Sequence, residues 1–188
     1  MPEVFDEITT LALAARGGDR HALAGFVRAT QGDVRALCAR VAGADVADDL
    51  TQEVFLRAWR ALPRFRADSS ARTWVLGIAR HVATDSVRAA SRRRELLRLV
   101  RPTRAQRDTA SDRVVVNDVL ETLDRDRRLA FVLTQLLGLS YAEAAQVCGC
   151  KVGTIRSRLY RARADLVEAI ERDADHGTGG GQFGSGPT

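Results

Sequence analysis

The stretch LSYAEAAQVCGCKVGTIRSRLYRARADL, residues 139–166, decides the fold of the C-terminal half. Ser140 and Glu143 have the spacing of a capping box, in which a serine hydroxyl and a glutamate carboxylate exchange hydrogen bonds with the first backbone amides of a helix. This pattern predicts a helix over 140–147 and a longer one over 152–172, with a glycine turn between them. Two helices joined in this way indicate a helix-turn-helix.

The longer helix has two faces of different chemistry. Its apolar residues recur every three or four positions and predict a buried stripe made of Val152, Ile155, Leu159, Ala162 and Leu166. The opposite face carries hydroxyls, arginines and a tyrosine, which suit contacts to phosphates and base edges in the major groove. We therefore expect DNA contacts from Lys151, Thr154, Arg156, Ser157, Arg158, Tyr160 and Arg161. The alternative is an amphipathic surface helix whose arginines are only solvated.

Helical patterns also account for the rest of the chain, so the expected fold class is all-α, with two small helical domains. Glycine and proline predict helices in the first half over 6–16, 19–41, 46–62 and 71–90. Asp19 and Asp45 are expected to cap the second and third of these. An apolar face spaced i, i+3, i+4, i+7, i+8 predicts a further helix that contains Leu129, Val132, Leu133, Leu136 and Leu137.

The expected domain boundaries follow from composition. Residues 1–90 form a first helical domain, and 113–172 form the helix-turn-helix domain. Between them, residues 91–112 hold seven arginines and a proline but few apolar side chains, which indicates a basic linker. Residues 91–100 fit an extension of the preceding helix equally well. The Gly-rich tail, 173–188, is expected to be disordered.

Composition restricts the function of these domains. The 188 residues include 29 basic residues, all arginine except Lys151, and the net charge is +5. A GC-rich genome explains the choice of arginine over lysine, but the basic segments also favour a polyanionic partner. The N-terminus is acidic rather than basic, and the longest uncharged stretch, 129–142, is too short to span a bilayer. We expect a cytoplasmic protein without a membrane segment.

The cysteines give no sign of a disulfide framework or a metal site. Cys148 and Cys150 have Cys-x-Cys spacing rather than the Cys-x2-Cys of zinc ligands, and His176 lies in the tail. Small buried cysteines at a tight helix corner are the favoured interpretation, and Cys38 is expected in the core. No nucleophile triad, phosphate-binding glycine loop or carboxylate dyad is present. We expect no enzymatic activity, no cofactor and no metal.

Three segments together resemble a known family. Residues 139–166 resemble the −35-reading region of bacterial extracytoplasmic-function (ECF, group IV) sigma factors of the sigma-70 family. DDLTQEVFLRAW at 48–59 is similar to their segment that docks on RNA polymerase, and FRADSSARTWVLGIARHVATDSVR at 65–88 is similar to their −10-reading segment. The chain resembles an actinobacterial-looking member. The resemblance implies a sigma factor that binds core polymerase and directs promoter-specific initiation.

The expected polymerase-docking surface lies on one side of the helix over 46–62. Carboxylates surround an apolar side chain there, an arrangement that suits a basic coiled coil through charge complementarity. The residues are Asp48, Asp49, Gln52, Glu53 and Leu56. Acidic residues near a helix N-terminus also suit the macrodipole, and the two explanations are compatible.

The resemblance implies that the loop and helix over 65–88 hold a flipped −10 base and the strand that carries it. The residues expected to contact this DNA are Asp68, Ser69, Ser70, Arg72, Arg80, His81, Thr84, Asp85 and Arg88. Trp74 shares a helix face with Ile78 and Val82, which favours a place in the core over base stacking. Primary sigma factors of the family carry several aromatic residues for melting, so the resemblance implies that this chain, with Trp74 as the lone aromatic of this helix, has weak intrinsic melting and narrow promoter demands.

The expected partners are promoter DNA and core RNA polymerase, through the clamp of its largest subunit and the flap on the −35 side. The resemblance also implies an anti-sigma factor, and we expect the free protein to be a monomer. The alternative is a stand-alone helix-turn-helix regulator, which needs a symmetric dimer; a protein-binding adaptor is a third possibility. The opposed charges of 45–53 and 151–163 permit intramolecular packing that masks the DNA-binding surfaces.

Overall fold

The computed structural model describes residues 5–100, 120 and 122–177, together with most of their side chains. These residues are mainly helical, and none of them forms a strand. The expected all-α fold class is confirmed. None of the helices in these ranges has a stretch that is both long and apolar enough to cross a membrane.

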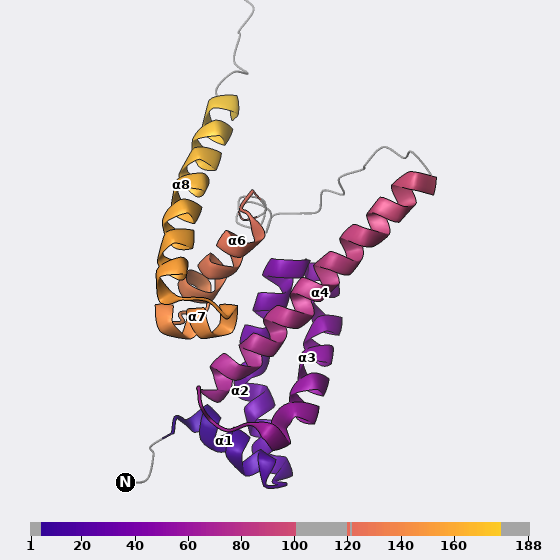
Figure 1. The fold of residues 1–188 in the computed structure, drawn as a ribbon, viewed down its shortest axis with the longest axis vertical. Coiled ribbons are helices and arrows are strands. Elements are labelled where there is room, and N and C mark those ends of the chain that lie inside the picture. The colour runs from indigo at the N-terminus through magenta and orange to yellow at the C-terminus, as the bar shows by residue number, and fades with distance from the viewer. Residues whose placement is uncertain (1–4, 101–119, 121, 178–188) are drawn as a thin grey trace, which may run out of the picture.

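Long helices joined by short turns build the first domain (Figure 1). They are α1 (Glu7–Arg16), α2 (Arg20–Ala42), α3 (Ala47–Ala61) and α4 (Ala71–Val100), with 3-10 turns at Ala44–Val46 and Leu62–Arg64. As predicted, Asp19 caps α2, because its side chain accepts hydrogen bonds from the amides of His21 (2.8 Å) and Ala22 (3.0 Å).

The predicted cap at Asp45 is wrong. The residue lies inside the 3-10 turn, and Val46, which precedes α3, makes no side-chain cap bond. The chain enters α3 through that turn, so the amide of Ala47 donates to the carbonyl of Ala44 rather than to a side chain.

The second domain consists of α6 (Arg125–Phe131), α7 (Tyr141–Cys148) and α8 (Val152–Gly177). A π-helical turn, Val132–Leu136, continues α6, so the predicted apolar helix is present and begins a turn earlier than its apolar face indicated. The chain then reverses at Gly138, whose φ of +69° lies in the left-handed region that glycine adopts without strain.

Two helices are longer than the sequence indicated. α4 continues to Val100, so residues 91–100 extend the helix, and α8 continues to Gly177. Arginine is a good helix former, and residues 91–100 contain neither glycine nor proline. The remainder of the expected linker, 101–112, and of the expected tail, 178–188, lies outside the described residues.

The two domains pack against each other. Figure 1 shows α6, α7 and α8 beside the α2–α4 bundle, with α4 against α7 and α2 against α6. Buried apolar residues from both domains belong to one continuous cluster, which includes Leu76 of α4 and Leu133 of the π-helical turn. Trp74 packs beside Phe65, with ring centroids 4.9 Å apart, and against the core as predicted.

Candidate DNA and polymerase interfaces

The helix-turn-helix is held by local hydrogen bonds. The amide of Ser140 donates to Glu143 Oε2 (2.8 Å), and the amide of Glu143 donates to Ser140 Oγ (3.2 Å), so the predicted capping box is confirmed. Gly149 ends α7 in the left-handed conformation, and the amide of Cys150 donates back to the carbonyl of Ala145 (3.0 Å). These bonds fix the angle at which α8 leaves the turn.

The position of α8 leaves its polar face open to solvent. Ile155, Leu159 and Ala162 are 0–2% exposed and pack inward, whereas Tyr160 on the opposite side is 79% exposed. The predicted DNA-contacting residues that are exposed with it are Lys151, Arg156, Ser157 and Arg161. Thr154 is half-buried, and its carbonyl accepts the Ser157 hydroxyl (3.0 Å).

Arg158 is turned toward its own domain. Its guanidinium forms an ion pair with Asp126 of α6, and Nη1 lies 3.8 Å from Cys150 Sγ. The side chain is 24% exposed. Arg158 therefore ties α8 to α6, which the sequence did not indicate because the ion pair joins residues 32 positions apart.

The cysteines of the turn are half-buried rather than buried, and they are free. Desolvation raises the pKa of the Cys148 thiol to about 12, so it stays protonated at neutral pH. Burial likewise raises the pKa of Cys38 to about 11. Thiolates rather than thiols bind metals, and in the described part of the chain no three metal-ligating side chains gather.

The expected −10 residues divide into two groups, of which the first faces the second domain. Arg72 Nε donates to Asp33 Oδ2 (2.7 Å), and its Nη2 donates to the carbonyl of Leu137 (2.7 Å) across the domain boundary. Arg80 lies close enough to Cys148 of α7 for its charge to act on the pKa of that thiol. These arginines are half-buried.

The second group remains accessible. His81, Asp85, Arg88 and the loop residue Asp68 are exposed, while Ser69 and Thr84 are half-buried. Ser70 forms hydrogen bonds with the first turn of α4. Its Oγ accepts from the Thr73 amide (3.2 Å) and donates to Thr73 Oγ1 (2.9 Å). The packing of the domains thus separates residues that the sequence placed in one DNA-contacting set.

Two of the acidic side chains of α3 form ion pairs with arginines. Asp48 accepts from Arg35 Nε at 2.6 Å, and this hydrogen bond and the charge of Arg35 lower the pKa of Asp48. Glu53 pairs with Arg57 one turn away (2.6 Å). Asp49 is exposed and belongs to none of the ion pairs found among the described residues.

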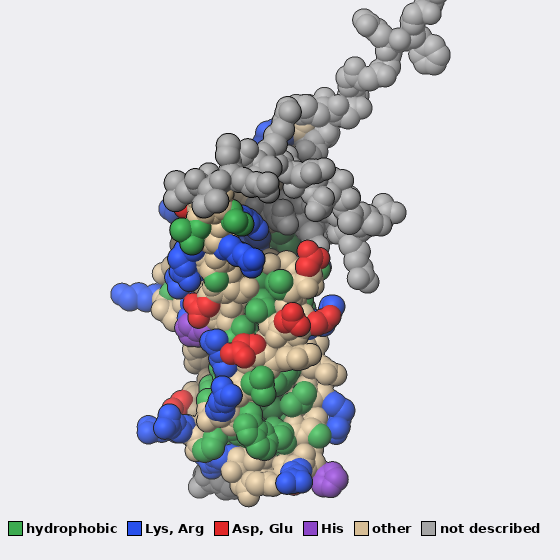
Figure 2. Space-filling model, turned by 90° about the vertical axis from the view of Figure 1, so that its right-hand side faces the viewer, with side chains coloured by type: hydrophobic (Ala, Val, Ile, Leu, Met, Phe, Trp, Pro, Cys, Tyr) green, Lys and Arg blue, Asp and Glu red, His purple; other side chains and the backbone are tan. Residues whose placement is uncertain are grey.

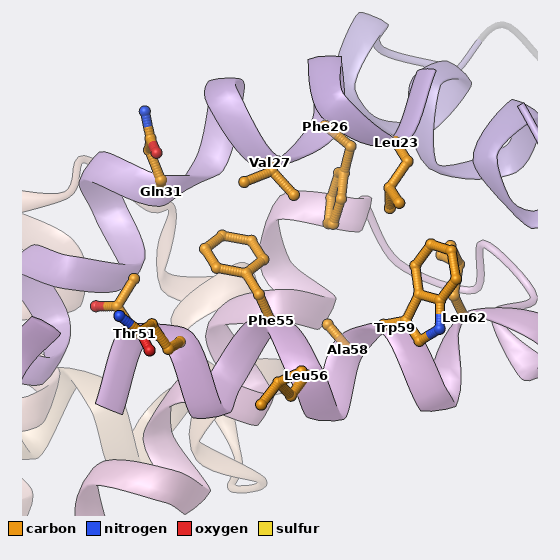
Figure 3. Close-up of a pocket in the computed structure, with 11 residues that line it drawn as sticks. Leu23, Phe26, Val27, Gln31, Thr51, Phe55, Leu56, Ala58, Trp59 and Leu62 are labelled. Carbon is orange, nitrogen blue, oxygen red and sulfur yellow. The ribbon is translucent and has the colours of Figure 1, made fainter. Parts of the chain in front are cut away.

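Beside these carboxylates, α2 and α3 enclose an apolar groove of about 540 Å³ (Figure 3). Leu56 and Trp59 are 53% and 56% exposed at its edge. The other apolar lining residues are Leu23, Phe26, Val27, Phe55, Ala58 and Leu62. On the face of the molecule drawn in Figure 2, apolar side chains gather in the lower half and acidic side chains lie above them. Trp59 is absent from the predicted docking residues, although an aromatic residue three positions after Leu56 continues the same helix face.

Among the described residues, no ion pair joins the acidic segment 45–53 to the basic segment 151–163, which the masking hypothesis brought together. Asp48 of the acidic segment pairs with Arg35, and Arg158 of the basic segment pairs with Asp126, so each charge is matched within its own domain. The domains meet instead through α4 and α7, where Arg72 makes its bond to Leu137.

The described residues combine an all-helical fold, a capped helix-turn-helix and an exposed basic helix face, an architecture typical of DNA-binding proteins. Residues 26–93 match the family model described as Sigma-70 region 2, and residues 113–166 match Sigma-70, region 4. The chain belongs to the sigma-70 family and is an ECF sigma factor. It thus serves promoter-specific transcription initiation, and the alternative of a stand-alone regulator is not supported.

Similar proteins agree with this assignment. The ECF RNA polymerase sigma factor SigC of Mycobacterium tuberculosis is 50% identical over 173 residues, which cover 89% of this chain and 94% of the relative. The ECF RNA polymerase sigma-E factor of Escherichia coli is 32% identical over 185 residues, covering 88% and 96%. CnrH, solved in complex with the cytosolic domain of CnrY, superposes with a TM-score of 0.71 at 30% identity, covering 89% and 99%. The sigma factor RpoE of Bartonella quintana, solved with the anti-sigma factor NepR, gives a TM-score of 0.66 at 29% identity, covering 77% and 94%.

Proposed function

We propose that the second domain reads the −35 element through the exposed face of α8, and that α4 and the loop before it read the −10 element. The exposure of that α8 face behind a rigid, capped turn is the observation that carries the proposal. A recognition helix positioned in this way can enter the major groove, where arginine and hydroxyl side chains read base edges. Catalysis of RNA synthesis belongs to the polymerase.

Core polymerase docks, in this proposal, on α3 and the apolar groove beside it. The Asp49 carboxylate and the exposed Leu56 and Trp59 offer charge next to apolar area. A basic helix from the clamp of the largest polymerase subunit fits both features, because charge steers the encounter and apolar burial holds the complex. The flap on the −35 side would hold the second domain.

The packed arrangement blocks part of the −10 surface. Two donors of Arg72 are engaged in the packed chain, Nε with Asp33 and Nη2 with the Leu137 carbonyl, and these donors are not available to DNA. We infer that the domains separate when core polymerase binds, and that the free chain is a monomer in which −10 reading is disabled. The structural relatives solved with CnrY and NepR support an anti-sigma partner for this chain as well.

The test is a pull-down with purified core RNA polymerase, followed by run-off transcription from a promoter library. Stoichiometric binding and promoter-specific transcripts are expected. Failure to bind core, together with tight binding of the free protein to duplex DNA, would instead favour a stand-alone regulator.

Two double variants test the division of labour. Arg161→Ala with Ser157→Ala should reduce −35-dependent transcription by tenfold or more while leaving core binding unchanged, since each good base contact contributes about 1–3 kcal/mol. Leu56→Ala with Asp49→Ala should weaken core binding and leave the DNA affinity of the second domain unchanged. Equal losses of core binding in both double variants would contradict the proposal.

A further inference from the structure

The first helix, α1, holds both ends of the loop that precedes α4. At the start of the loop, Arg16 Nη1 donates to the carbonyl of Phe65 (2.7 Å). At its end, Thr9 Oγ1 accepts the amide of Ala71, the first residue of α4 (2.9 Å). These bonds join residues 49 and 62 positions apart, and Figure 1 shows α1 beside the start of α4. The loop is therefore fixed at both ends by a separate helix.

The bond at the end of the loop is made by a hydroxyl whose orientation is fixed. Thr9 is 1% exposed, and its Oγ1 donates to Asp6 Oδ2 (2.5 Å), so a lone pair of the same oxygen faces the Ala71 amide. The first amides of a helix have no partner within it, and Ser70 accepts only that of Thr73. Thr9 completes this cap from α1, and its replacement by valine would leave the Ala71 amide without this acceptor.

The middle of the loop carries backbone strain. Ala67 has a φ of +61°, in the left-handed region that residues other than glycine rarely occupy. Such a conformation persists where the surrounding contacts impose it. Here α1 holds the two ends, and Phe65 is buried against Trp74. On either side of Ala67, the side chains of Arg66 and Asp68 remain exposed. The loop thus combines a fixed backbone with accessible side chains.

We propose that α1 is a positioning element for −10 recognition, in which Thr9 and Arg16 hold the loop over 65–70 in the shape that receives an unpaired base. Both residues act through the loop rather than by touching DNA, and the proposal rests on the −10 function proposed above. A loop that is ordered before the strand arrives binds it more tightly, because less conformational entropy is lost on binding. The match to Sigma-70 region 2 begins at residue 26 and does not include α1.

Hydrogen exchange of the full-length free chain tests the hold on the loop without DNA. Thr9→Val and Arg16→Met should each speed exchange of the protected amides over 65–74 by about threefold to tenfold, the loss expected for one ordinary hydrogen bond, while the amides of α7 keep the rates of the parent protein. Thr10→Val and Arg20→Met are the matched controls. The Thr10 hydroxyl donates to a carbonyl four positions back (3.0 Å), and Arg20 is exposed at the start of α2. Unchanged exchange over 65–74 in both test variants would overturn the proposal.

The effect on DNA is measured with holoenzyme assembled from core polymerase and the full-length chain. The probe is single-stranded DNA of a promoter recovered by run-off transcription, with an abasic site placed at each −10 position in turn. In the parent protein, the abasic site at the captured base should lower affinity by about tenfold or more. Thr9→Val should weaken binding of the intact strand by about threefold to tenfold and reduce the penalty of that abasic site. Thr9→Ser, which keeps the hydroxyl, should restore both.

The outcomes separate positioning from folding and from the −10 function itself. Affinity for core polymerase should be unchanged in every variant, and Arg16→Met, at an exposed position, carries the test if Thr9→Val fails to fold. A penalty for the abasic site as large in both variants as in the parent would overturn the positioning role and leave the −10 function intact. A loss in Thr9→Val that Thr9→Ser does not restore would also overturn that role for Thr9. A parent protein indifferent to every abasic site would refute the −10 function of the loop, and the positioning role with it.

Discussion

The bond from Arg72 to the Leu137 carbonyl gives the sharpest test of how the domains are held together. Arg72→Ala removes the donor that crosses the boundary, whereas Asp33, its other partner, belongs to the same domain as Arg72. A hydrogen bond to a charged group contributes about 1.5–3 kcal/mol, and the lower part of this range applies because Arg72 is 29% exposed. At about 1.5–2 kcal/mol, the ratio of open to packed molecules should rise roughly 10- to 30-fold.

Single-molecule energy transfer measures this ratio. The two dyes are attached at Arg60→Cys in α3 and Glu171→Cys in α8, both exposed positions, after the three native cysteines are replaced by alanine. Arg88→Ala is the matched control, because its pair with Asp85 (3.7 Å) lies within one helix and is exposed. An Arg72→Ala population identical to that of Arg88→Ala would refute the reasoning.

Two further predictions concern local features. Ser140→Ala removes the capping box and should lower the free energy of unfolding of the helix-turn-helix by about 1 kcal/mol. The measurement is the midpoint of urea unfolding. A midpoint equal to that of the parent protein would contradict the role of the cap. The Cys38 thiol has a pKa raised from 9.0 to about 11 by burial, so the folded protein keeps this proton where the unfolded chain loses it. Stability should therefore fall as pH rises from 9 to 11, and a Cys38→Ala variant should show a smaller fall in unfolding midpoint over that interval.

Features of short range were predictable from the sequence. The capping box at Ser140 and the cap at Asp19 involve residues two or three positions apart, so their spacing alone carries the information. The same is true of the α8 stripe around Ile155 and Leu159, because helical periodicity fixes which side chains share a face. Exposure of Tyr160 follows from its place opposite that stripe.

Features that depend on packing between distant segments were not predictable. The Arg72 bond to Leu137 joins residues 65 positions apart, and the pair of Arg158 with Asp126 spans 32 positions. Arg158 was assigned to DNA from its helix face and Arg72 from the resemblance of residues 65–88 to a −10-reading segment, and both criteria are local. The extension of α4 to Val100 was left open for a different reason: its arginines favour a helix by propensity, while the scarcity of apolar residues favours a linker.

The domain packing leaves one of the two proposed DNA-contacting surfaces open and engages part of the other, which implies an order of events in the proposed function. The face of α8 around Arg161 is open in the packed chain, while Arg72 of the −10 surface is engaged. A chain in this state can sample duplex DNA through weak, salt-dependent phosphate contacts, but it is not equipped to capture an unpaired strand. In the proposed function, search along the double helix and capture of the melted strand are therefore successive steps, and opening of the domain boundary is the transition between them.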